Sequence, residues 1–494
     1  MQIKQLDKEV SRIFFASRAE FCENLSRKRL GIHQPLSFKK EKGETYVYNH
    51  ELEILALRSV VSRETKIEYY SKAVWLHRCI RYIRDQEYIS NLIVENDMDS
   101  ALAGIQFLQF SGQQTYDFLY YRYNFFFNFC NEEINMKQIF ESKINIPYMF
   151  FDLFIYVTQV WATLEDYCNF NNFTAFIGEE LSNVLRFLTT EREEFIEEYK
   201  EYTSNEKSTI IFDFNLLISK PFIIFEGIVY CMYAPYIPYA CTKSLMFEVT
   251  KGDDTLRSFI GKNVIEEYVY DLVTNSKVTN KFNCIKEFEY KNGRENERSP
   301  DIIIYSTKEI LFLEVKFFNQ GLNLRSLDNI AINTAKQRIG KSITQLYKSI
   351  YKFEKGLMSC ALPNTEYKKI YGMIILYDEF YFSRLDSYEL AQKEMISFGI
   401  QAEFQEIVNK IRIMPLSFFE SVLYHSSDDI FEYCELLFDP IKMNFNDRYY
   451  TFFNETKGNM PVIDKFLDNR FNQYKSLYEE KLKWLKKENE SKMI

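Results

Sequence analysis

The stretch that decides the fold is SPDIIIYSTKEILFLEVKFF, residues 299–318. Its isoleucine- and leucine-rich runs are interrupted by a short polar segment, a pattern typical of two strands joined by a tight turn. We expect antiparallel strands over 301–305 and 310–316. In the simplest register Tyr305 lies opposite Ile310, and every other pair follows from that one. The fold around this hairpin should therefore contain a sheet.

Three charged side chains interrupt the apolar hairpin. In this register Asp301 lies opposite Glu314, and Lys316 shares the face of Glu314 because side chains alternate along a strand. Two opposed carboxylates repel each other, and a hard cation such as Mg²⁺ removes that repulsion, usually with one or two carboxylates and waters. The pattern predicts a Mg²⁺ or Mn²⁺ site at the acids, with Lys316 offsetting charge that develops on a phosphorus centre. A solvated polar face is the alternative, and the apolar remainder of both strands argues against it.

Helix and strand patterns alternate around the hairpin. Over 332–354 apolar residues recur at steps of three and four, which predicts an amphipathic helix. Such alternation is typical of an α/β domain. The other predicted elements are a helix over 250–273, a strand over 281–290, an apolar strand over 368–382 and a strand running into a helix over 410–423.

Pro300-Asp301, Glu314 and Lys316 together resemble the motif of the PD-(D/E)XK nuclease superfamily, whose members have a restriction-endonuclease-like fold. The order of the elements over 250–425 is also similar to that family. The resemblance implies a mixed central sheet flanked by helices and a metal-dependent phosphodiesterase acting on nucleic acid. The motif is short, so its specificity comes from the elements around it.

Relatives of this kind often carry one more acid on the helix before the hairpin, and Glu266 and Glu267 are the candidates. At about 100° per residue, Glu266 lies near the edge of the apolar arc of that helix, and Glu267 lies nearly opposite its centre. An acid that contributes to a buried site should border the core. We therefore expect Glu266 to join Asp301 and Glu314 as a catalytic and metal-binding residue, with Glu267 as the solvated alternative.

The predicted helix after the hairpin is strongly basic. A concentration of positive charge is what contact with a phosphate backbone requires, although a solvated basic face remains the alternative. Gln345 is similar to a glutamine that many relatives place near the metal. The residues expected to bind nucleic acid are Lys336, Arg338, Lys341, Lys348 and Lys352.

The chain of 494 residues is long enough for two or three domains. In the connecting segment, Glu226-Gly227 separates two apolar runs and predicts a turn. The most apolar stretch, 148–164, includes Asp152 and is expected to be a buried helix rather than a membrane span. The expected organisation is a mainly helical domain over 1–205, a β-rich connecting segment over 206–250, the nuclease-like domain over 251–435 and a helical extension over 436–494.

Composition bears on the compartment and on the partners. The formal net charge of −9 excludes a generally basic surface, so that any nucleic-acid contact must be local. Nine cysteines without a CxxC pair indicate free thiols in a reducing compartment, and the beginning of the chain lacks the apolar core of a signal peptide. We expect a cytoplasmic protein without a membrane partner.

Two functions from different classes follow. The first is a metal-dependent nuclease, an endonuclease rather than an exonuclease with DNA as the favoured substrate, which resembles effectors of restriction or antiviral defence. In that case residues 1–205 would sense a signal, bind a protein partner or another copy of the chain, or restrain cleavage. The second is a catalytically silent nuclease-like fold that binds nucleic acid or acts as a scaffold. Intact Asp301, Glu314 and Lys316 favour the first.

Overall fold

The computed structural model consists of two compact units. One unit comprises Met1–Lys251, Arg325–Asp328 and Asn469–Ile494, and the other comprises Gly252–Leu324 and Asn329–Asp468. The predicted connecting segment 206–250 thus belongs to the first unit, and the predicted extension 436–494 is divided between both. The residues that the structure describes are 2–27, 36–40, 43–64, 72–84, 116–163, 169–174, 177–205, 215–276, 281–318, 329–358, 362, 367–378, 385–425, 429–438 and 460–492.

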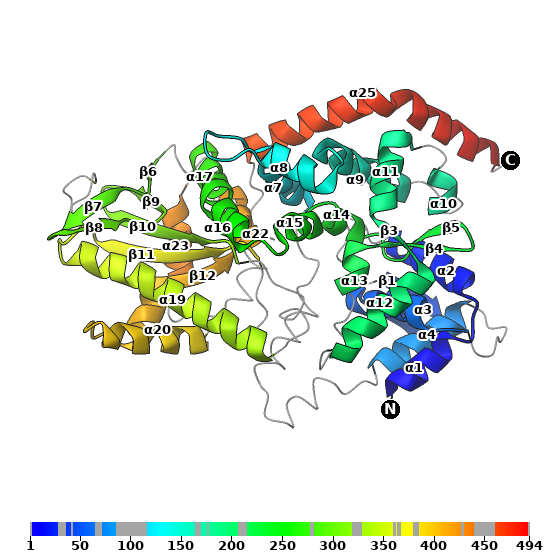
Figure 1. The fold of residues 1–494 in the computed structure, drawn as a ribbon, viewed down its shortest axis with the longest axis horizontal. Coiled ribbons are helices and arrows are strands. Elements are labelled where there is room, and N and C mark those ends of the chain that lie inside the picture. The colour runs from blue at the N-terminus through cyan, green and yellow to red at the C-terminus, as the bar shows by residue number, and fades with distance from the viewer. Residues whose placement is uncertain are drawn as a thin grey trace. The chain divides into compact units, whose positions relative to one another are not determined.

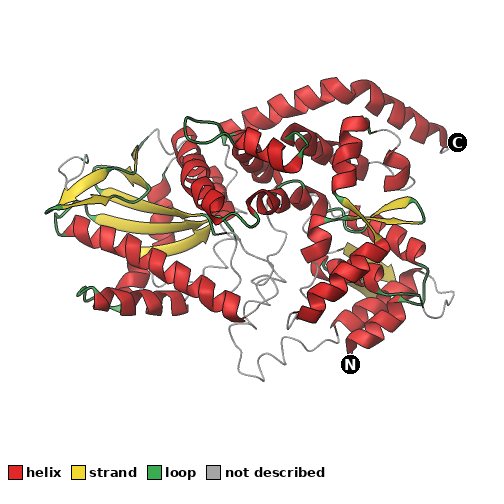
Figure 2. Cartoon of the chain, in the orientation of Figure 1, coloured by secondary structure: helices red, strands yellow, loops and turns green. Residues whose placement is uncertain are grey.

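The first unit is mainly helical, as the sequence predicts for its N-terminal part (Figure 1, Figure 2). Its strands are β1 (Leu36–Lys40) and β2 (Gly43–Val47), which pair as a hairpin, and β3 (Thr189–Glu191), β4 (Phe222–Phe225) and β5 (Ile228–Cys231), which form a small sheet. Its helices are α1 (Gln2–Val10), α2 (Phe15–Arg27), α3 (Asn49–Val61), α4 (Lys72–Arg84), α7 (Tyr116–Asn128), α8 (Met136–Ile144), α9 (Tyr148–Thr163), α10 (Phe170–Phe173), α11 (Glu179–Phe187), α12 (Arg192–Asn205), α13 (Asn215–Ser219), α14 (Tyr236–Ala240), α15 (Lys243–Thr250) and most of α25 (Pro461–Lys492).

The acid within the apolar helix α9 has partners from two other helices. Asp152 is buried, and its carboxylate accepts hydrogen bonds from the phenol of Tyr474 at 2.5 Å and from the amide of Asn124 at 3.2 Å. Arg470 of α25 lies 3.6 Å from the same oxygen. These partners offset the cost of burying a carboxylate. The prediction of a buried helix at this position is confirmed, and within the described residues none of the helices has both the length and the apolar character of a membrane span.

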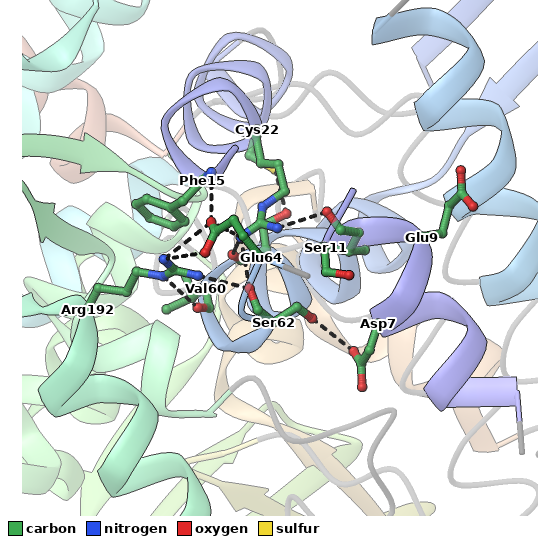
Figure 3. Close-up of polar contacts among 12 residues, drawn as sticks. Asp7, Glu9, Ser11, Phe15, Cys22, Val60, Ser62, Glu64 and Arg192 are labelled. Atoms are coloured by element: carbon green, nitrogen blue, oxygen red, sulfur yellow. Dashed lines mark hydrogen bonds and ion pairs between the residues drawn. The ribbon is translucent and has the colours of Figure 1, made fainter. Parts of the chain in front are cut away.

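Two buried arginines converge on one carboxylate in the first unit (Figure 3). A guanidinium nitrogen of Arg18 lies 3.1 Å from an oxygen of Glu64, and one of Arg192 lies 3.4 Å from each oxygen. The N–H of Phe15, at the start of α2, donates to Glu64 at 2.9 Å. Both arginines also donate to the carbonyl of Ser62 at 2.9 Å, directly after α3. The network therefore satisfies carbonyls at the end of α3 that the helix itself leaves without partners.

The prediction of a β-rich segment over 206–250 is correct only in its middle. Strands β4 and β5 form the predicted hairpin around Glu226 and Gly227, whose φ angles are 52° and 76°. Residues on either side are helical, in α13, α14 and α15. The pattern of a short apolar run is the same for a strand and for a buried helix. Here the run is helical because it packs against the helical core of the first unit. Leu217 of α13, for example, is fully buried in that core.

The second unit contains a mixed five-stranded sheet, which confirms the expected α/β architecture. The strand order is β12 (Ile411–Pro415), β11 (Lys369–Leu376), β10 (Glu309–Lys316), β9 (Ile302–Tyr305) and β6 (Asn283–Lys286). Strands β10, β11 and β12 run parallel, whereas β9 is antiparallel to both of its neighbours. Apolar residues fill β9 and most of β10, as suits strands that are buried on both faces.

Helices cover both faces of this sheet. Gly372 and Tyr371 are neighbours on β11 and so point to opposite faces. A Cβ on Gly372 would lie 2.8 Å from Cδ1 of Ile350, which shows how closely α19 (Asn329–Glu354) packs on that face. The ring centroid of Tyr371 lies 4.9 Å from that of Phe438, in α23 (Ile430–Phe438), on the other face. Figure 1 shows the sheet between these two helices.

The remaining elements of the second unit surround this core. The helix predicted over 250–273 is present but contains one π-helical turn, and its Asp253 side chain caps it by accepting from the N–H of Leu256 at 2.8 Å. The strand-to-helix passage predicted over 410–423 is confirmed. The elements are α16 (Asp254–Ile260), the π-turn η2 (Gly261–Ile265), α17 (Glu266–Asn275), α20 (Leu385–Ser397), α21 (Phe404–Lys410) and α22 (Leu416–His425).

The single strand predicted over 281–290 is two strands. β6 pairs with β9 as far as Lys286 and Ile302, where β9 begins. Beyond that pair the chain continues with two backbone hydrogen bonds, from the N–H of Glu287 to the carbonyl of Asp301 and from the N–H of Ser299 to the carbonyl of Phe288. It then forms a separate hairpin of β7 (Glu289–Asn292) and β8 (Glu295–Arg298), which turns at Gly293 with φ of 63°. β8 was not predicted because its sequence, ENER, has no apolar alternation.

Candidate active site

The register of the β9–β10 hairpin is the predicted one. Tyr305 pairs with Ile310, and the ladder ends at the pair of Ile302 and Leu313. The turn is held by Ser306, whose hydroxyl accepts from the N–H groups of Lys308 and Glu309 at 3.0 and 2.9 Å. Asp301 lies one residue before β9, so its side chain is at the end of this ladder, next to the position of Glu314.

Asp301 is fixed to β10 by its side chain. One carboxylate oxygen accepts the backbone N–H of Val315 at 2.6 Å. Burial raises the pKa of Asp301, and the negative charge of Glu314 raises it further, while Lys316 and the Val315 N–H act in the opposite direction. The structure thus brings Asp301 close to Glu314, as the register predicts, and makes the ionisation of both at once unfavourable.

Glu314 and Lys316 lie on the face of the sheet that α19 covers. Phe312 lies on the same face, two residues before Glu314, and its ring centroid lies 5.3 Å from that of Phe353 in α19. Nζ of Lys316 is 2.5 Å from Oε1 of Glu314. Glu314 is 1% exposed, whereas the Lys316 side chain is 32% exposed. The pair therefore has a buried acid and a lysine whose side chain is partly exposed.

The two groups of this pair respond differently to burial. Burial raises the pKa of Glu314, and the positive charge of Lys316 opposes that effect. For Lys316 burial acts to lower the pKa, but the charges of Glu314 and Asp301 and the hydrogen bond to Glu314 outweigh it, so that the pKa is raised. Lys316 therefore stays positive at neutral pH, with carboxyl groups around it.

Of the two candidate acids on α17, Glu266 is the one for which the structure shows an electrostatic interaction with this cluster. Burial raises its pKa, and the charge of Asp301 is the next largest cause. Glu267 instead forms a salt bridge with Lys286, with a distance of 2.6 Å between Nζ and Oε2. Glu266, at the edge of the apolar arc of α17, thus lies toward the cluster. Glu267 lies toward β6, the edge strand of the sheet.

Two contacts fix the position of α17. A Cβ on Gly261 would lie 2.9 Å from Cβ of Phe317, so glycine permits the π-turn to approach the residue after Lys316. The phenol of Tyr268 donates to the carboxylate of Glu420 in α22 at 2.7 Å, with both side chains fully buried. π-Turns within helices are frequent at functional sites, because the extra residue re-aims the side chains that follow. Here the residue that follows directly is Glu266.

One acid of this cluster was not singled out from the sequence. The N–H of Glu287 donates to the carbonyl of Asp301 at 2.8 Å, and its carboxylate lies 3.3 Å from Arg298. Its negative charge raises the pKa values of Asp301, Glu314 and Glu266. Glu287 directly follows β6, and only the observed register of β6 against β9 places it there.

The donors of the cluster fit a hard divalent cation in chemistry and charge. Carboxylate oxygens are the ligands that Mg²⁺ and Mn²⁺ prefer, and one ammonium cannot balance Asp301 and Glu314 when both are ionised. However, among the described residues no group of three or more His, Cys, Asp or Glu side chains is arranged to hold a metal ion. The expected set of three carboxylate ligands is therefore not assembled. Two carboxylates, at Asp301 and Glu314, remain the set that fits.

Two lysines of α19 have protein partners. Lys336 is not on an exposed basic face as expected, because its ammonium is buried and lies 2.5 Å from Asp386 of α20. Lys352 lies 2.6 Å from Glu297 of β8 and thereby links α19 to the small hairpin. The helix packs against α20 and the hairpin as well as the sheet, which the sequence period alone does not reveal. These two lysines are occupied by internal ion pairs.

The other predicted contacts on α19 are more accessible. Arg338, Lys341 and Gln345 are exposed, and Lys348 lies with Nζ 3.7 Å from the ring centroid of Phe398. The guanidinium of Arg338 lies 5.5 Å from the ring centroid of Phe318, two residues beyond Lys316. Gln345 is on the exposed side of the helix and is not among the groups that the structure brings to the acids.

Comparison of the chain with protein-family models finds no match, and searches of the curated proteins and of the solved structures find none either. The resemblance to PD-(D/E)XK nucleases therefore rests on the residues of this chain alone. Those residues are Asp301, Glu314 and Lys316 at the end of a two-stranded ladder, with Glu266 supplied by the preceding helix.

Proposed function

We propose that the second unit is a metal-dependent nuclease with a restriction-endonuclease-like fold that hydrolyses phosphodiester bonds, with DNA as the favoured substrate. The observation that carries this proposal is the cluster of Asp301, Glu314 and Glu266, which interact electrostatically with each other and with Lys316. Clusters of buried carboxyls with strongly shifted pKa values and a specific charge partner mark functional sites more often than structural ones.

Each residue has a distinct role in this proposal. Asp301 and Glu314 would hold a divalent cation, and that ion would lower the pKa of a bound water and offset negative charge on the leaving oxygen. Asp301 is oriented for this task by the Val315 N–H. Lys316 stabilises negative charge on the phosphate, because it carries the positive charge and its side chain is the partly exposed member of the Glu314 pair. Glu266, which favours its protonated form, is placed to exchange a proton with groups in the site.

A second function, binding of nucleic acid without cleavage, is favoured by one observation. The described residues do not present a ready group of three metal ligands, and the Glu314 carboxylate is engaged by Lys316. A silent site of this kind would keep a charged pair for stability alone. The two functions differ in one measurable property, which is cleavage that depends on a divalent metal.

The test is cleavage of supercoiled plasmid, single-stranded DNA and RNA by the full chain with Mg²⁺ or Mn²⁺, compared with the same reactions in EDTA. We expect metal-dependent cleavage by the wild type and its loss in Glu314→Gln and Asp301→Asn. Glu309→Gln is the matched control, since Glu309 lies at the other end of β10 and pairs with Lys369 instead. Cleavage that persists in Glu314→Gln, or that is absent from the wild type on every substrate, would exclude the proposed site.

A further inference from the structure

Two backbone hydrogen bonds fix the chain at Phe318, two residues after Lys316. Its backbone N–H donates to the carbonyl of Lys316 at 2.9 Å, and the N–H of Tyr377, directly after β11, donates to the same carbonyl at 2.9 Å. A hydrogen bond from one residue to the second residue before it closes a γ-turn, which is the smallest turn. The end of β10 is therefore a tight turn that fixes the backbone of Phe318 against that of Lys316.

A cation from α19 lies against this ring. The guanidinium carbon of Arg338 is 5.5 Å from the Phe318 ring centroid, within the range of a cation–π contact. Phe318 is half-buried, whereas Arg338 is exposed. The ring thus supports the guanidinium from the protein side, and the guanidinium is the part of the pair that faces solvent.

A supported guanidinium plane suits a nucleobase better than a phosphate. A phosphate contact needs only positive charge, which a lysine supplies as a compact point charge. Arginine differs because its planar group also stacks, and proteins use arginine planes and aromatic rings to stack bases that have left a duplex. Bases within a duplex are stacked on each other, so this mode of binding requires an unpaired base.

We propose that Arg338, supported by Phe318, is a stacking platform for a nucleobase next to the phosphate at Lys316, so that the site takes nucleic acid whose bases are unpaired at the point of cleavage. This inference rests on the proposed nuclease function, because Lys316 and the acids define where the phosphate lies. It assigns Arg338 a role other than the phosphate contact expected from the charge of the helix.

Binding of two single-stranded oligodeoxynucleotides without divalent metal tests this platform. One oligodeoxynucleotide carries all its bases, and the other is abasic through its central tract, so both present the same phosphates. Stacking of one base contributes about 1–3 kcal/mol, so we expect the wild type to bind the abasic strand about 5- to 150-fold more weakly. Arg338→Ala should remove most of that difference. Arg338→Lys keeps the charge and should remove it as well.

The chain offers a matched control on the same helix. Lys348 and Phe398 form another cation–π pair, with Nζ 3.7 Å from the ring centroid. Phe398→Ala should therefore keep the wild-type preference for the strand that carries bases. Phe318→Ala should reduce that preference, because Arg338 loses its support.

Three results would overturn the platform. They are equal binding of both strands by the wild type, equal weakening of both by Arg338→Ala, and an unchanged preference in Arg338→Lys. The nuclease proposal is judged separately, by metal-dependent cleavage and its loss in Glu314→Gln. A chain that cleaves but binds both strands equally keeps the nuclease and rejects the platform. A chain that prefers bases but never cleaves keeps the stacking surface and rejects the nuclease.

Discussion

Nζ of Lys316 lies 2.5 Å from Oε1 of Glu314, two residues earlier on the same face of β10, and only the lysine of this pair reaches solvent. Two roles are compatible with this contact. Lys316 can act on the substrate, or it can serve only to neutralise a buried carboxylate. The roles differ in what a substitution does to stability and to cleavage.

Lys316→Ala should reduce single-turnover cleavage by on the order of 10²–10³, because one electrostatic contact to the developing charge is lost. Binding of nucleic acid should persist. Lys316→Arg should restore activity only in part, since a broad guanidinium does not replace a compact ammonium in a tight site. Thermal melts and cleavage measured on the same preparations separate this loss from unfolding.

Lys308→Ala is the control for Lys316, since Lys308 is exposed in the turn at the opposite end of the same hairpin. It should melt and cleave as the wild type does. If Lys316→Ala lowers cleavage only as far as it lowers the folded fraction, then Lys316 is a structural partner of Glu314. If it melts and cleaves like the wild type, neither role holds.

Glu266→Gln should impair cleavage more than Glu267→Gln. Glu266 interacts with the charge of Asp301, whereas Glu267 is engaged by Lys286 near the sheet edge. Both substitutions keep the size of the side chain, so that the comparison isolates charge and proton exchange. The measurement is the cleavage rate at saturating metal. The opposite order would mean that the rotation of α17 about its axis is not the one that brings Glu266 to the site.

Mn²⁺ should bind the wild type and bind Asp301→Ala much more weakly. Asp301 and Glu314 supply the hard oxygen ligands, and loss of one of two carboxylates removes half of the protein's charge at the ion. Titration calorimetry without nucleic acid gives the affinities directly. Asp254→Ala is the control, because Asp254 lies exposed on α16 in the same unit. Equal binding by Asp301→Ala and the wild type would place the metal elsewhere.

The hairpin and the placement of its charged residues were predictable because a short polar turn separates two apolar runs. The turn over 306–309 sets the register, and this register together with the two-residue period of a strand puts Asp301 beside Glu314. Glu266 followed from a second period, that of the helix, even though the π-turn interrupts it just before that residue. Such patterns are local in the sequence, and they can be recognised without knowing which distant segments pack against the strand or the helix.

What the sequence did not reveal depends on contacts between distant segments. Lys336 reads as one more basic residue on an exposed helix face, but the position is buried because α20 packs there with Asp386. Glu287 joins the acids only through the end of the β6–β9 ladder. Leu217 lies in an apolar run whose pattern predicts a strand. It is helical, in α13, and its side chain is buried in the core of the first unit.

Arg192→Ala should destabilise the first unit by about 1–3 kcal/mol, because the interior carbonyl of Val60 loses the donor that Arg192 supplies and Glu64 loses one of its two arginine partners. Urea denaturation of the full chain measures the change. Arg63→Ala breaks the Arg63–Glu193 pair, in which both side chains are more than half exposed, and should cost less than about 0.5 kcal/mol. Similar costs for both variants would show that the network in Figure 3 adds little beyond a surface ion pair.

The stability of the first unit should fall as pH rises from about 4.5 to about 8, the range set by Glu53. Burial in the core raises the pKa of Glu53 from 4.5 to about 8 despite the hydrogen bond with Tyr233. In this range the folded chain keeps a proton that the unfolded chain releases, so the free energy of unfolding decreases with pH. One proton corresponds to about 1.4 kcal/mol per pH unit within the window.

Glu53→Gln isolates this contribution, because the amide has the same shape and does not titrate. Burial also raises the pKa of Glu23, to about 7, so the wild-type slope contains more than one proton, and the difference between wild type and variant is the quantity to measure. Urea denaturation at pH values between 4.5 and 8 should show that the free energy of unfolding falls more steeply with pH for the wild type than for Glu53→Gln. The variant should therefore gain stability relative to the wild type as pH rises. Glu180→Gln, at an exposed position of α11, should run parallel to the wild type. If Glu53→Gln also ran parallel, Glu53 would have to be ionised in the folded chain at pH 7, and its burial would need a cationic partner.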